Sequence, residues 1–390
     1  MMKTNTLKLR LIGTYLLGYG ALACYFPYMA IYFKSRGLSY IETGIAFAVT
    51  SLVSIAAQPI MGYISDKYLN KKQVIMINIL ACSGLIYLYI FAQGFYTILL
   101  AIIFQIFFQS SIMSITDAYC YDIADHTPTV NYGQIRLVGS FGYALVALIL
   151  GAVIQQRGIN VAFVLYSLLF ILTALFLGGI RHHSTLNAAR PHISDVAAVL
   201  KNINFILFVL SVLILNITLA AHNNYVAMMI EATGGNVSNL GIVWFVQAIS
   251  EIPLFYFGAK LLKKYGELNV YIFAVLLYFV RMLLTSMSSS YMQVIGVQFM
   301  QSITYPLYLF SAMQYVKILV PDRLRASGIT LLSSLGFGLG GLIGNLGGGY
   351  ILQYAGPFFL YRVLTAVCIL SAALALLLKF TQKQQNIYSA

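Results

Sequence analysis

The amino-acid sequence predicts an all-α membrane protein with twelve transmembrane helices in two pseudo-symmetric six-helix bundles. Hydrophobic residues make up 60% of the 390 positions and charged residues only 8%, whereas a soluble domain has about 25% charged residues. About twelve apolar stretches fill the chain, most with the roughly 20 residues that a helix needs to cross a bilayer core. Two carboxylates and three arginines lie inside these stretches, which makes them candidates for the working site.

The predicted spans follow one another with short polar loops between them. The first six lie near residues 11–33, 43–64, 73–92, 96–121, 134–154 and 160–180. The last six lie near residues 203–229, 239–262, 268–287, 291–319, 325–354 and 357–380. The first span is too long for the apolar core of a signal peptide, so we interpret it as a membrane helix. The longest polar stretch, 181–202, is predicted to be a central cytoplasmic loop between an N-terminal bundle, 1–180, and a C-terminal bundle, 203–390.

The distribution of Lys and Arg predicts the orientation of the chain. One alternating set of loops and termini carries 17 of the 23 basic residues, and the other set carries Lys34, Arg36 and Arg157. Because positively charged loops stay inside, both termini are expected in the cytoplasm of a multi-pass protein of the cell membrane. Asp122 and Asp125 make one of these cytoplasmic loops acidic, which composition does not explain.

Several classes of function are disfavoured by the sequence. The net charge of +13 does not indicate a nucleic-acid partner, because the basic residues lie in short loops and form no basic domain. The four cysteines fall inside apolar runs without a CxxC or Cys/His cluster, so neither a metal site nor a disulfide framework is expected. No catalytic constellation and no nucleotide-binding motif stand out, which argues against an enzyme or an ATP-driven pump.

The two halves of the chain also echo each other. The segment GYISDKYLNKK begins at Gly62, and GAKLLKKYGEL begins at Gly258, each after a span that contains a proline. Arg136-Leu-Val-Gly has a similar counterpart in Arg325-Ala-Ser-Gly. Halves related by such a repeat are typical of transporters in which one bundle rocks against the other around a central site.

The segment Gly62-x-x-x-Asp66-Lys67-x-x-x-Lys71-Lys72 resembles the loop 2–3 signature of the major facilitator superfamily, with Leu69 in place of its inner glycine. The resemblance implies the major facilitator fold. It also implies that these five matching residues form a conformational gate, which latches the outward-facing state through charge contacts with the neighbouring bundle. Alternatively, the lysines only fix the topology.

Three further segments are similar to the lactose permease and phenylpropionate permease group: YFPYMAIY from Tyr25, Gln58-Pro-x-x-Gly, and YGQIR from Tyr132. This resemblance implies a solute:proton symporter. Asp117 falls near the substrate-binding acid of that group, Arg136 matches its arginine partner, and Arg281 matches its span-nine arginine. Glu251 matches its span-eight acid more loosely.

The sequence departs from that group in span ten, where Gln301 and Thr304 replace the histidine and glutamate used in proton coupling. Coupling is therefore expected to depend on Glu251 or Asp117, because neither replacement carries a proton near neutral pH. The span-five motif of drug/proton antiporters is absent, which favours uptake over export.

Helix geometry adds candidates for the site. Trp244, Gln247 and Glu251 share one face of span eight, and Gln301 and Tyr305 share a polar face of span ten. Packing and interhelical hydrogen bonds are the alternative explanations of such faces. The predicted substrate site comprises Asp117, Arg136, Asn223, Trp244, Gln247, Glu251, Arg281, Gln301 and Tyr305.

Ion pairs are expected between Asp117 and Arg136 and between Glu251 and Arg281, because a lone charge in a span costs at least about 2.5 kcal/mol. His222, with an unperturbed pKa of about 6.5, could titrate during transport, although a structural role is favoured. Glycines at four-residue intervals in span eleven predict a tightly packed helix face: Gly336, Gly340, Gly344 and Gly348.

Together these features predict a monomeric secondary active transporter that takes up a small organic solute by alternating access. Protons are the expected coupling ion, and no cofactor or metal is expected. A sugar, a nucleoside and an aromatic acid all remain open as substrates. The alternatives are a proton-driven exporter of drugs or sugars and, in a different class, a membrane-embedded sensor or enzyme.

Overall fold

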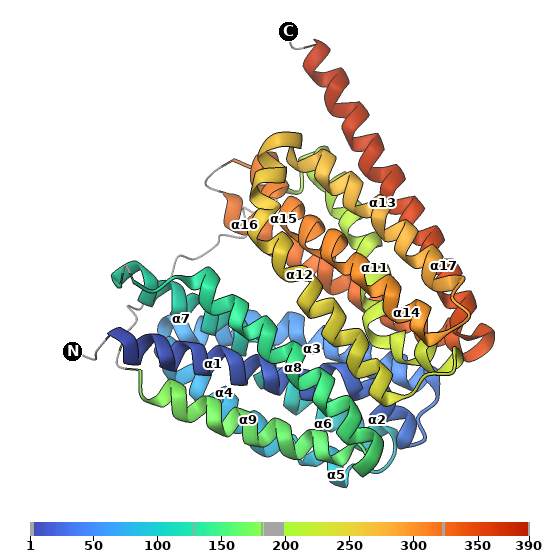
Figure 1. The fold of residues 1–390 in the computed structure, drawn as a ribbon. Helices are drawn as coiled ribbons and strands as arrows, with labels where there is room; N and C mark the ends of the chain where they lie inside the picture. The colour runs from blue at the N-terminus through green and yellow to red at the C-terminus, as the bar shows by residue number, and fades with distance from the viewer. Residues whose placement is uncertain (1–3, 128, 181, 183–198, 322–323, 389–390) are drawn as a thin grey trace. The chain divides into compact units, whose positions relative to one another are not determined.

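The structure is a computed structural model that describes residues 4–127, 129–180, 182, 199–321 and 324–388. Throughout these described residues the regular secondary structure is helical (Figure 1). Most of the predicted central loop, residues 181 and 183–198, lies outside them.

By their contacts the helices form two compact units. The first unit comprises Met1–Ala189 with Asn236–Ile249, and the second comprises Arg190–Gly235 with Ser250–Ala390. Helices of the first unit are α1 (Thr4–Tyr25), η1 (Phe26–Tyr28), α2 (Met29–Ser35), α3 (Tyr40–Lys67), α4 (Lys71–Leu85), α5 (Leu88–Phe91), α6 (Phe95–Gln109), α7 (Ile112–His126), α8 (Tyr132–Arg157) and α9 (Asn160–Gly178). Helix α12 (Val237–Tyr265) contributes its first half to this unit.

The second unit takes the remainder of α12 and the helices on either side of it. These are α11 (Ile203–Ala232), α13 (Glu267–Ser286), α14 (Tyr291–Val297), η2 (Gln298–Met300), α15 (Gln301–Leu319), α16 (Arg325–Leu331), η4 (Leu332–Leu339) and α17 (Gly340–Tyr388).

The helices account for all twelve predicted spans. Ten helical segments of the described chain are long and apolar enough to cross a membrane. One of them, Ser327–Thr381, covers both predicted spans eleven and twelve. The two spans are separated by a bend at Gly356, which has a left-handed φ of 76° just before Pro357. Predicted span ten is not among the ten, but it is helical as α14, η2 and α15. The all-α membrane fold is therefore confirmed.

Several spans are interrupted where a straight helix was expected. Helix α6 ends at Gln109 and α7 begins at Ile112, which breaks span four. The 3₁₀ turn η2 breaks span ten immediately before Gln301, and the π-helix η4 occupies part of span eleven. Each break loosens the regular hydrogen bonding of a helix, and such discontinuities are frequent near functional sites.

Each unit is held together by a close helix crossing at glycine. In the first unit a Cβ on Gly142 of α8 would lie 2.3 Å from the Leu16 carbonyl oxygen of α1. In the second unit the four glycines predicted to share a face contact α11, and a Cβ on Gly344 would lie 2.4 Å from the Ile217 carbonyl oxygen. Figure 1 shows α1 beside α8 and α11 beside α17. The glycine face predicted in span eleven is thus confirmed as a packing surface.

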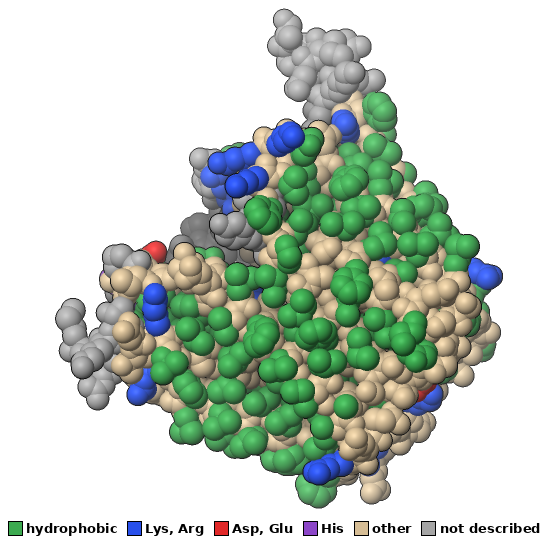
Figure 2. Space-filling model, viewed as in Figure 1, with side chains coloured by type: hydrophobic (Ala, Val, Ile, Leu, Met, Phe, Trp, Pro, Cys, Tyr) green, Lys and Arg blue, Asp and Glu red, His purple; other side chains and the backbone are tan. Residues whose placement is uncertain are grey.

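The outer surface of the helices is apolar. Figure 2 shows hydrophobic side chains spread over the visible helix faces, with Lys and Arg gathered mainly near helix ends. Large apolar side chains such as Leu145, Leu175 and Phe273 are about half exposed or more. An apolar surface of this extent is suited to contact with lipid tails and not with water.

Candidate functional site

A chain of polar side chains in the second unit centres on Arg281 of α13. Its side chain is 1% exposed, so the guanidinium is removed from solvent. It donates hydrogen bonds to Gln301, to Thr304 Oγ1 (3.3 Å) and to Gln298 Oε1 (2.6 Å). It also contacts His222 Nε2 at 3.1 Å. Within the described residues, none of these four partners is a carboxylate.

Gln301 links Arg281 to Glu251. Its amide oxygen accepts from Arg281, while its Nε2 donates to Glu251 Oε1 at 2.6 Å. An amide bridge thus connects Glu251 and Arg281, and their direct ion pair stays a prediction. An amide can stand between a cation and an anion because it accepts at one end and donates at the other.

His222 of α11 is held between two partners in the same network. Nε2 faces Arg281 at 3.1 Å, and Nδ1 lies 2.9 Å from the Tyr361 hydroxyl of α17. A guanidinium has donors only, so Nε2 must be the accepting nitrogen and Nδ1 must carry the proton. The contacts therefore select one neutral tautomer of a histidine that is 2% exposed.

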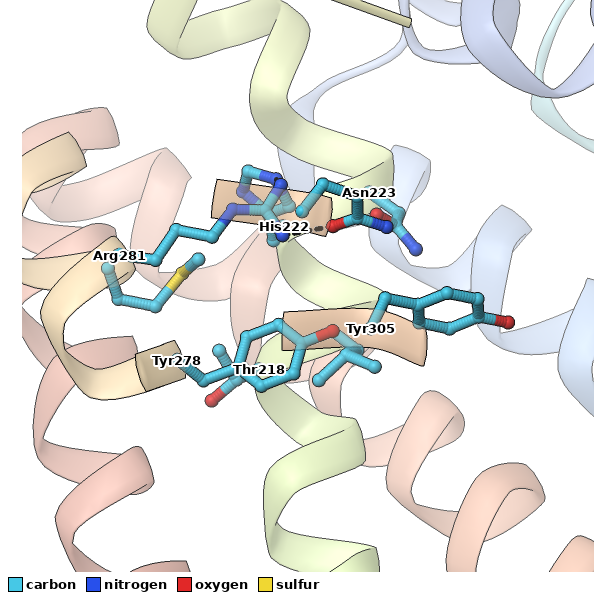
Figure 3. A pocket seen from close by; sticks show the side chains of 9 residues that line it. Thr218, His222, Asn223, Tyr278, Arg281 and Tyr305 are labelled. Carbon is cyan, nitrogen blue, oxygen red and sulfur yellow. Dashed lines mark hydrogen bonds between the residues drawn. The ribbon is translucent and has the colours of Figure 1, made fainter. Parts of the chain in front are cut away.

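A small cavity of about 10 Å³ lies against this network, enough for about one water molecule. Figure 3 shows Arg281 reaching toward His222 on one side of it, with Asn223 and Tyr305 also at its wall. Four of the predicted substrate residues line the cavity: Asn223, Arg281, Gln301 and Tyr305. Apolar neighbours, among them Leu219 and Met282, complete part of its wall. The structure thus brings these four residues together, and Gln301 connects them to Glu251.

Asp117 and Arg136 form a second group, in the first unit. The Tyr15 hydroxyl of α1 donates to Asp117 Oδ1 at 2.7 Å. The Arg136 guanidinium lies over the ring of Tyr19, 4.1 Å from its centroid, and donates to Ser140 Oγ at 3.3 Å. Tyr15 and Tyr19 stack one turn apart on α1. Among the described contacts this tyrosine pair connects the two charges, and their direct ion pair stays a prediction.

Trp244 and Gln247 lie on the first half of α12, which belongs to the first unit. The Trp244 ring packs edge to face against Tyr143 of α8, with 6.2 Å between centroids, and Gln247 is buried. Gly241 of the same segment approaches Gly151 of α8 closely, since a Cβ on Gly241 would lie 3.2 Å from the Gly151 Cα. That these residues share one chamber with Glu251 stays a prediction.

The residues of the predicted gate contact the first unit itself. Lys71 forms a 2.6 Å ion pair with Asp122 of α7, and Lys72 donates to the carbonyl oxygens of Gly178 and Ile180. This ion pair explains the acidic residue Asp122 in a loop predicted to be cytoplasmic, because its carboxylate neutralises Lys71.

The rest of that motif lies at the end of α3. Lys67 donates to the Tyr63 hydroxyl at 2.8 Å and lies over the ring of Tyr68. Asp66 is half-buried, and a Cβ added to Gly62 would meet no other atom within 4 Å. A latch between bundles, as the resemblance implies, stays a prediction.

The titratable side chains are not arranged for metal binding in the part of the chain that the structure describes. No three His, Cys, Asp or Glu residues come close enough there to hold a metal ion. The residue that sequence reasoning underrated is His222, since only its distance to Arg281 reveals its role in the network.

Comparison with known proteins identifies relatives over nearly the whole chain. Residues 8–363 match the MFS_1 like family. The uncharacterized transporter YwbF of Bacillus subtilis (strain 168) is 26% identical over 379 residues, covering 96% of this chain and 94% of YwbF. The maltose permease of Geobacillus stearothermophilus is 26% identical over 93% of this chain and 92% of the permease. A crystal structure of a mutant of the nucleoside transporter NupG matches with a TM-score of 0.87 at 15% identity, covering 95% of this chain and 99% of NupG, which shows a shared fold.

Proposed function

Since the chain belongs to the MFS_1 like family, we propose that this secondary active transporter takes up a maltose-type oligosaccharide together with protons. The relative described as a maltose permease extends over 93% of the chain. The cavity of the second unit is lined by amide, hydroxyl and guanidinium groups beside aromatic rings. Such groups can bind the hydroxyls of a sugar and pack against its faces.

The hydrogen bond from Gln301 to Glu251 is the observation that carries the proton-coupling proposal. It connects an acid inside a membrane span to the small cavity that Gln301 and Arg281 line. Protonation of Glu251 would remove its charge and weaken its attraction for the Gln301 amide. Because Gln301 also holds Arg281, the loading of a proton would alter the groups that face the solute.

Further elements of the proposal concern the protein's setting. We propose that it works as a monomer in the cell membrane, with both termini in the cytoplasm and without a nucleic-acid partner. The support is the charge distribution of the loops and the apolar surface of both units. No cofactor other than the coupling proton enters the proposal.

The first experiment measures uptake of radiolabelled maltose by purified protein in liposomes with an acidic exterior. Raffinose, melibiose, uridine and an aromatic acid complete the panel. One proton per sugar should give about tenfold accumulation per pH unit, abolished by a protonophore. Proton-driven movement of maltose in the opposite direction would indicate an exporter, and failure of maltose to accumulate would contradict the proposal.

Glu251→Gln tests the carrier role of Glu251. The amide keeps the size of the side chain but cannot take up a proton in this range. We expect the variant to lose accumulation driven by the pH gradient while it still exchanges internal for external maltose. Glu267→Gln, the same change in the first turn of α13, is the matched control and should accumulate maltose normally. Wild-type accumulation by Glu251→Gln would rule out the role.

A further inference from the structure

The position of His222 imposes a choice on the second unit. Its Nε2 lone pair faces an Arg281 guanidinium nitrogen 3.1 Å away, and its Nδ1 hydrogen is directed to the Tyr361 hydroxyl. A proton added to Nε2 would place an N–H group against another N–H group and one cation beside another. Arg281 and a proton therefore compete for this nitrogen.

Arg281 already has a second direction in which to move. Its Nη1 is bonded to Gln301, whereas its Nη2 faces His222, and Gln301 is bonded in turn to Glu251. When Glu251 is ionised, its carboxylate attracts the guanidinium, and a shift of Arg281 toward it would free Nε2 of His222. When Glu251 carries a proton, that attraction is lost and the contact between Arg281 and His222 is favoured.

We propose that His222 Nε2 is an internal proton-binding site of the transport cycle, which opens when Arg281 moves from His222 toward Glu251. In the same step as this movement, the Glu251 O–H bond breaks and an Nε2–H bond forms, directly or through water. The guanidinium keeps its charge and exchanges the imidazole for the carboxylate. This inference rests on the proposed proton-coupled uptake and assigns it a second proton acceptor.

Charge balance supports this pairing of sites. Before the step the three side chains carry one positive charge, on Arg281. After it they carry two positive charges and one negative charge, so the net charge of the buried network is unchanged. A net charge added to a poorly solvated interior is costly, and this exchange avoids it.

The surroundings of His222 contain the other groups that could influence a proton there. Arg281 faces it from α13 and Tyr361 from α17, and Gln298 of η2 is a further hydrogen-bond partner. Glu251 of α12 is linked through Gln301 of α15. Two further tyrosines, Tyr278 and Tyr305, line the adjoining cavity. Among these described neighbours Glu251 is the acid, which makes it the donor for the transfer.

Transport by His222→Gln tests the proposal in the same liposomes. A glutamine oxygen can still accept from Arg281 but cannot bind the transferred proton. We expect exchange of maltose at equal pH to continue, and the accumulation ratio to fall from about tenfold per pH unit to one. His126→Gln, at the exposed end of α7, is the matched control and should accumulate maltose as the wild type does.

Nitrogen NMR of the imidazole gives a readout that a structural role would not move. The His222 signal, assigned by its loss in His222→Gln, should report the neutral form with a proton on Nδ1 in the wild type from about pH 6 to 8. In Arg281→Gln the same signal should become that of a charged ring within this range. A ring already charged in the wild type, or neutral throughout in Arg281→Gln, would overturn the proposal.

The outcomes separate this inference from the function on which it rests. If the wild type does not accumulate maltose against a pH gradient, the proposed function fails, whereas the NMR titration still shows whether Arg281 excludes a proton. If the wild type accumulates maltose and His222→Gln does so equally, only the role of His222 fails. Loss of exchange together with accumulation in His222→Gln would assign the residue to structure alone and would also overturn the inference.

Discussion

Gln301 shows how one neutral side chain can take the place of a charged one in a buried network. The resemblance to the lactose permease group led us to expect that proton coupling depends on Glu251 or Asp117 and not on span ten, since glutamine cannot carry a proton. In the structure the amide instead connects Arg281 to Glu251. Direct pairing would lock the two charges together, whereas a bridge leaves each free to change partner. The substitution therefore suits a network that rearranges.

The Tyr15–Asp117 hydrogen bond allows a prediction for the first unit. Tyr15 is fully buried, and its hydroxyl orients the carboxylate at 2.7 Å. A hydrogen bond to a charged group contributes about 1.5–3 kcal/mol. If Asp117 binds the solute, Tyr15→Phe should raise the half-saturating solute concentration at least tenfold, as measured by initial rates of uptake.

The control for this change is Tyr25→Phe, which removes a buried hydroxyl contact to Tyr89 and leaves Asp117 untouched. We expect it to lower the melting temperature without changing the apparent affinity. An unchanged affinity in Tyr15→Phe would mean that Asp117 is not oriented for the solute by Tyr15.

Individual residues also mark the limit of prediction from sequence. The buried charges could be found because ionised side chains are rare in membrane spans. Their partners could not, since spacing along a helix gives no distance to another helix. Asp122 had no explanation until Lys71 was found 2.6 Å away, and His222 appeared structural until Arg281 was found beside it.

At the scale of helices, the glycine crossings support a second prediction. A Cβ on Gly344 would lie 2.4 Å from a backbone oxygen of α11, which cannot give way as a side chain could. Gly344→Ala should therefore force α17 and α11 apart and cost about 1–3 kcal/mol, seen as a lower melting temperature in detergent.

Gly347 is the matched control on the same helix, because a Cβ there would have no other atom within 4 Å. Alanine is a better helix former than glycine, so Gly347→Ala should be neutral or slightly stabilising. Equal melting temperatures for the two variants would contradict the close packing of α17 on α11.

The interruptions of the helices were harder to predict than the helices. Hydrophobic runs revealed all of the spans because every backbone group in a bilayer must be satisfied within the helix. The break between α6 and α7 falls at Ser110 and Ser111, and the 3₁₀ turn η2 begins at Gln298. A few polar residues in an apolar run do not distinguish a break from the polar face of a continuous helix. Both breaks come shortly before predicted site residues, Asp117 and Gln301, in spans four and ten. This shared pattern fits the internal repeat that the sequence suggested.

At the scale of the whole molecule, composition and the loop 2–3 motif were enough to predict the fold and the family. The match of residues 8–363 to the MFS_1 like family confirms the predicted major facilitator membership. Hydropathy has this power because the lipid environment admits few architectures. It carries no information on substrate, since many solutes bind to similar sets of amides, hydroxyls and aromatic rings.

Orientation in the membrane is the remaining prediction for the whole molecule, and the chain offers a clean way to test it. The four cysteines at positions 24, 82, 120 and 368 are buried, so they should react little with a membrane-impermeant maleimide. Gln93 is exposed between α5 and α6, in a loop predicted to lie outside. Lys264 and Lys379 are exposed in segments predicted to lie in the cytoplasm. We therefore expect Gln93→Cys to be labelled on intact cells.

Lys264→Cys and Lys379→Cys should be labelled only after the cells are permeabilised, and the two should agree because α13 to α17 together cross the membrane an even number of times. The bias of 17 basic residues against three makes the opposite orientation unfavourable, since lysine and arginine resist translocation. Labelling of Lys264→Cys on intact cells would reverse the orientation. Labelling of only one of the two lysine positions would instead contradict the number of spans, because an odd number of crossings would then separate them.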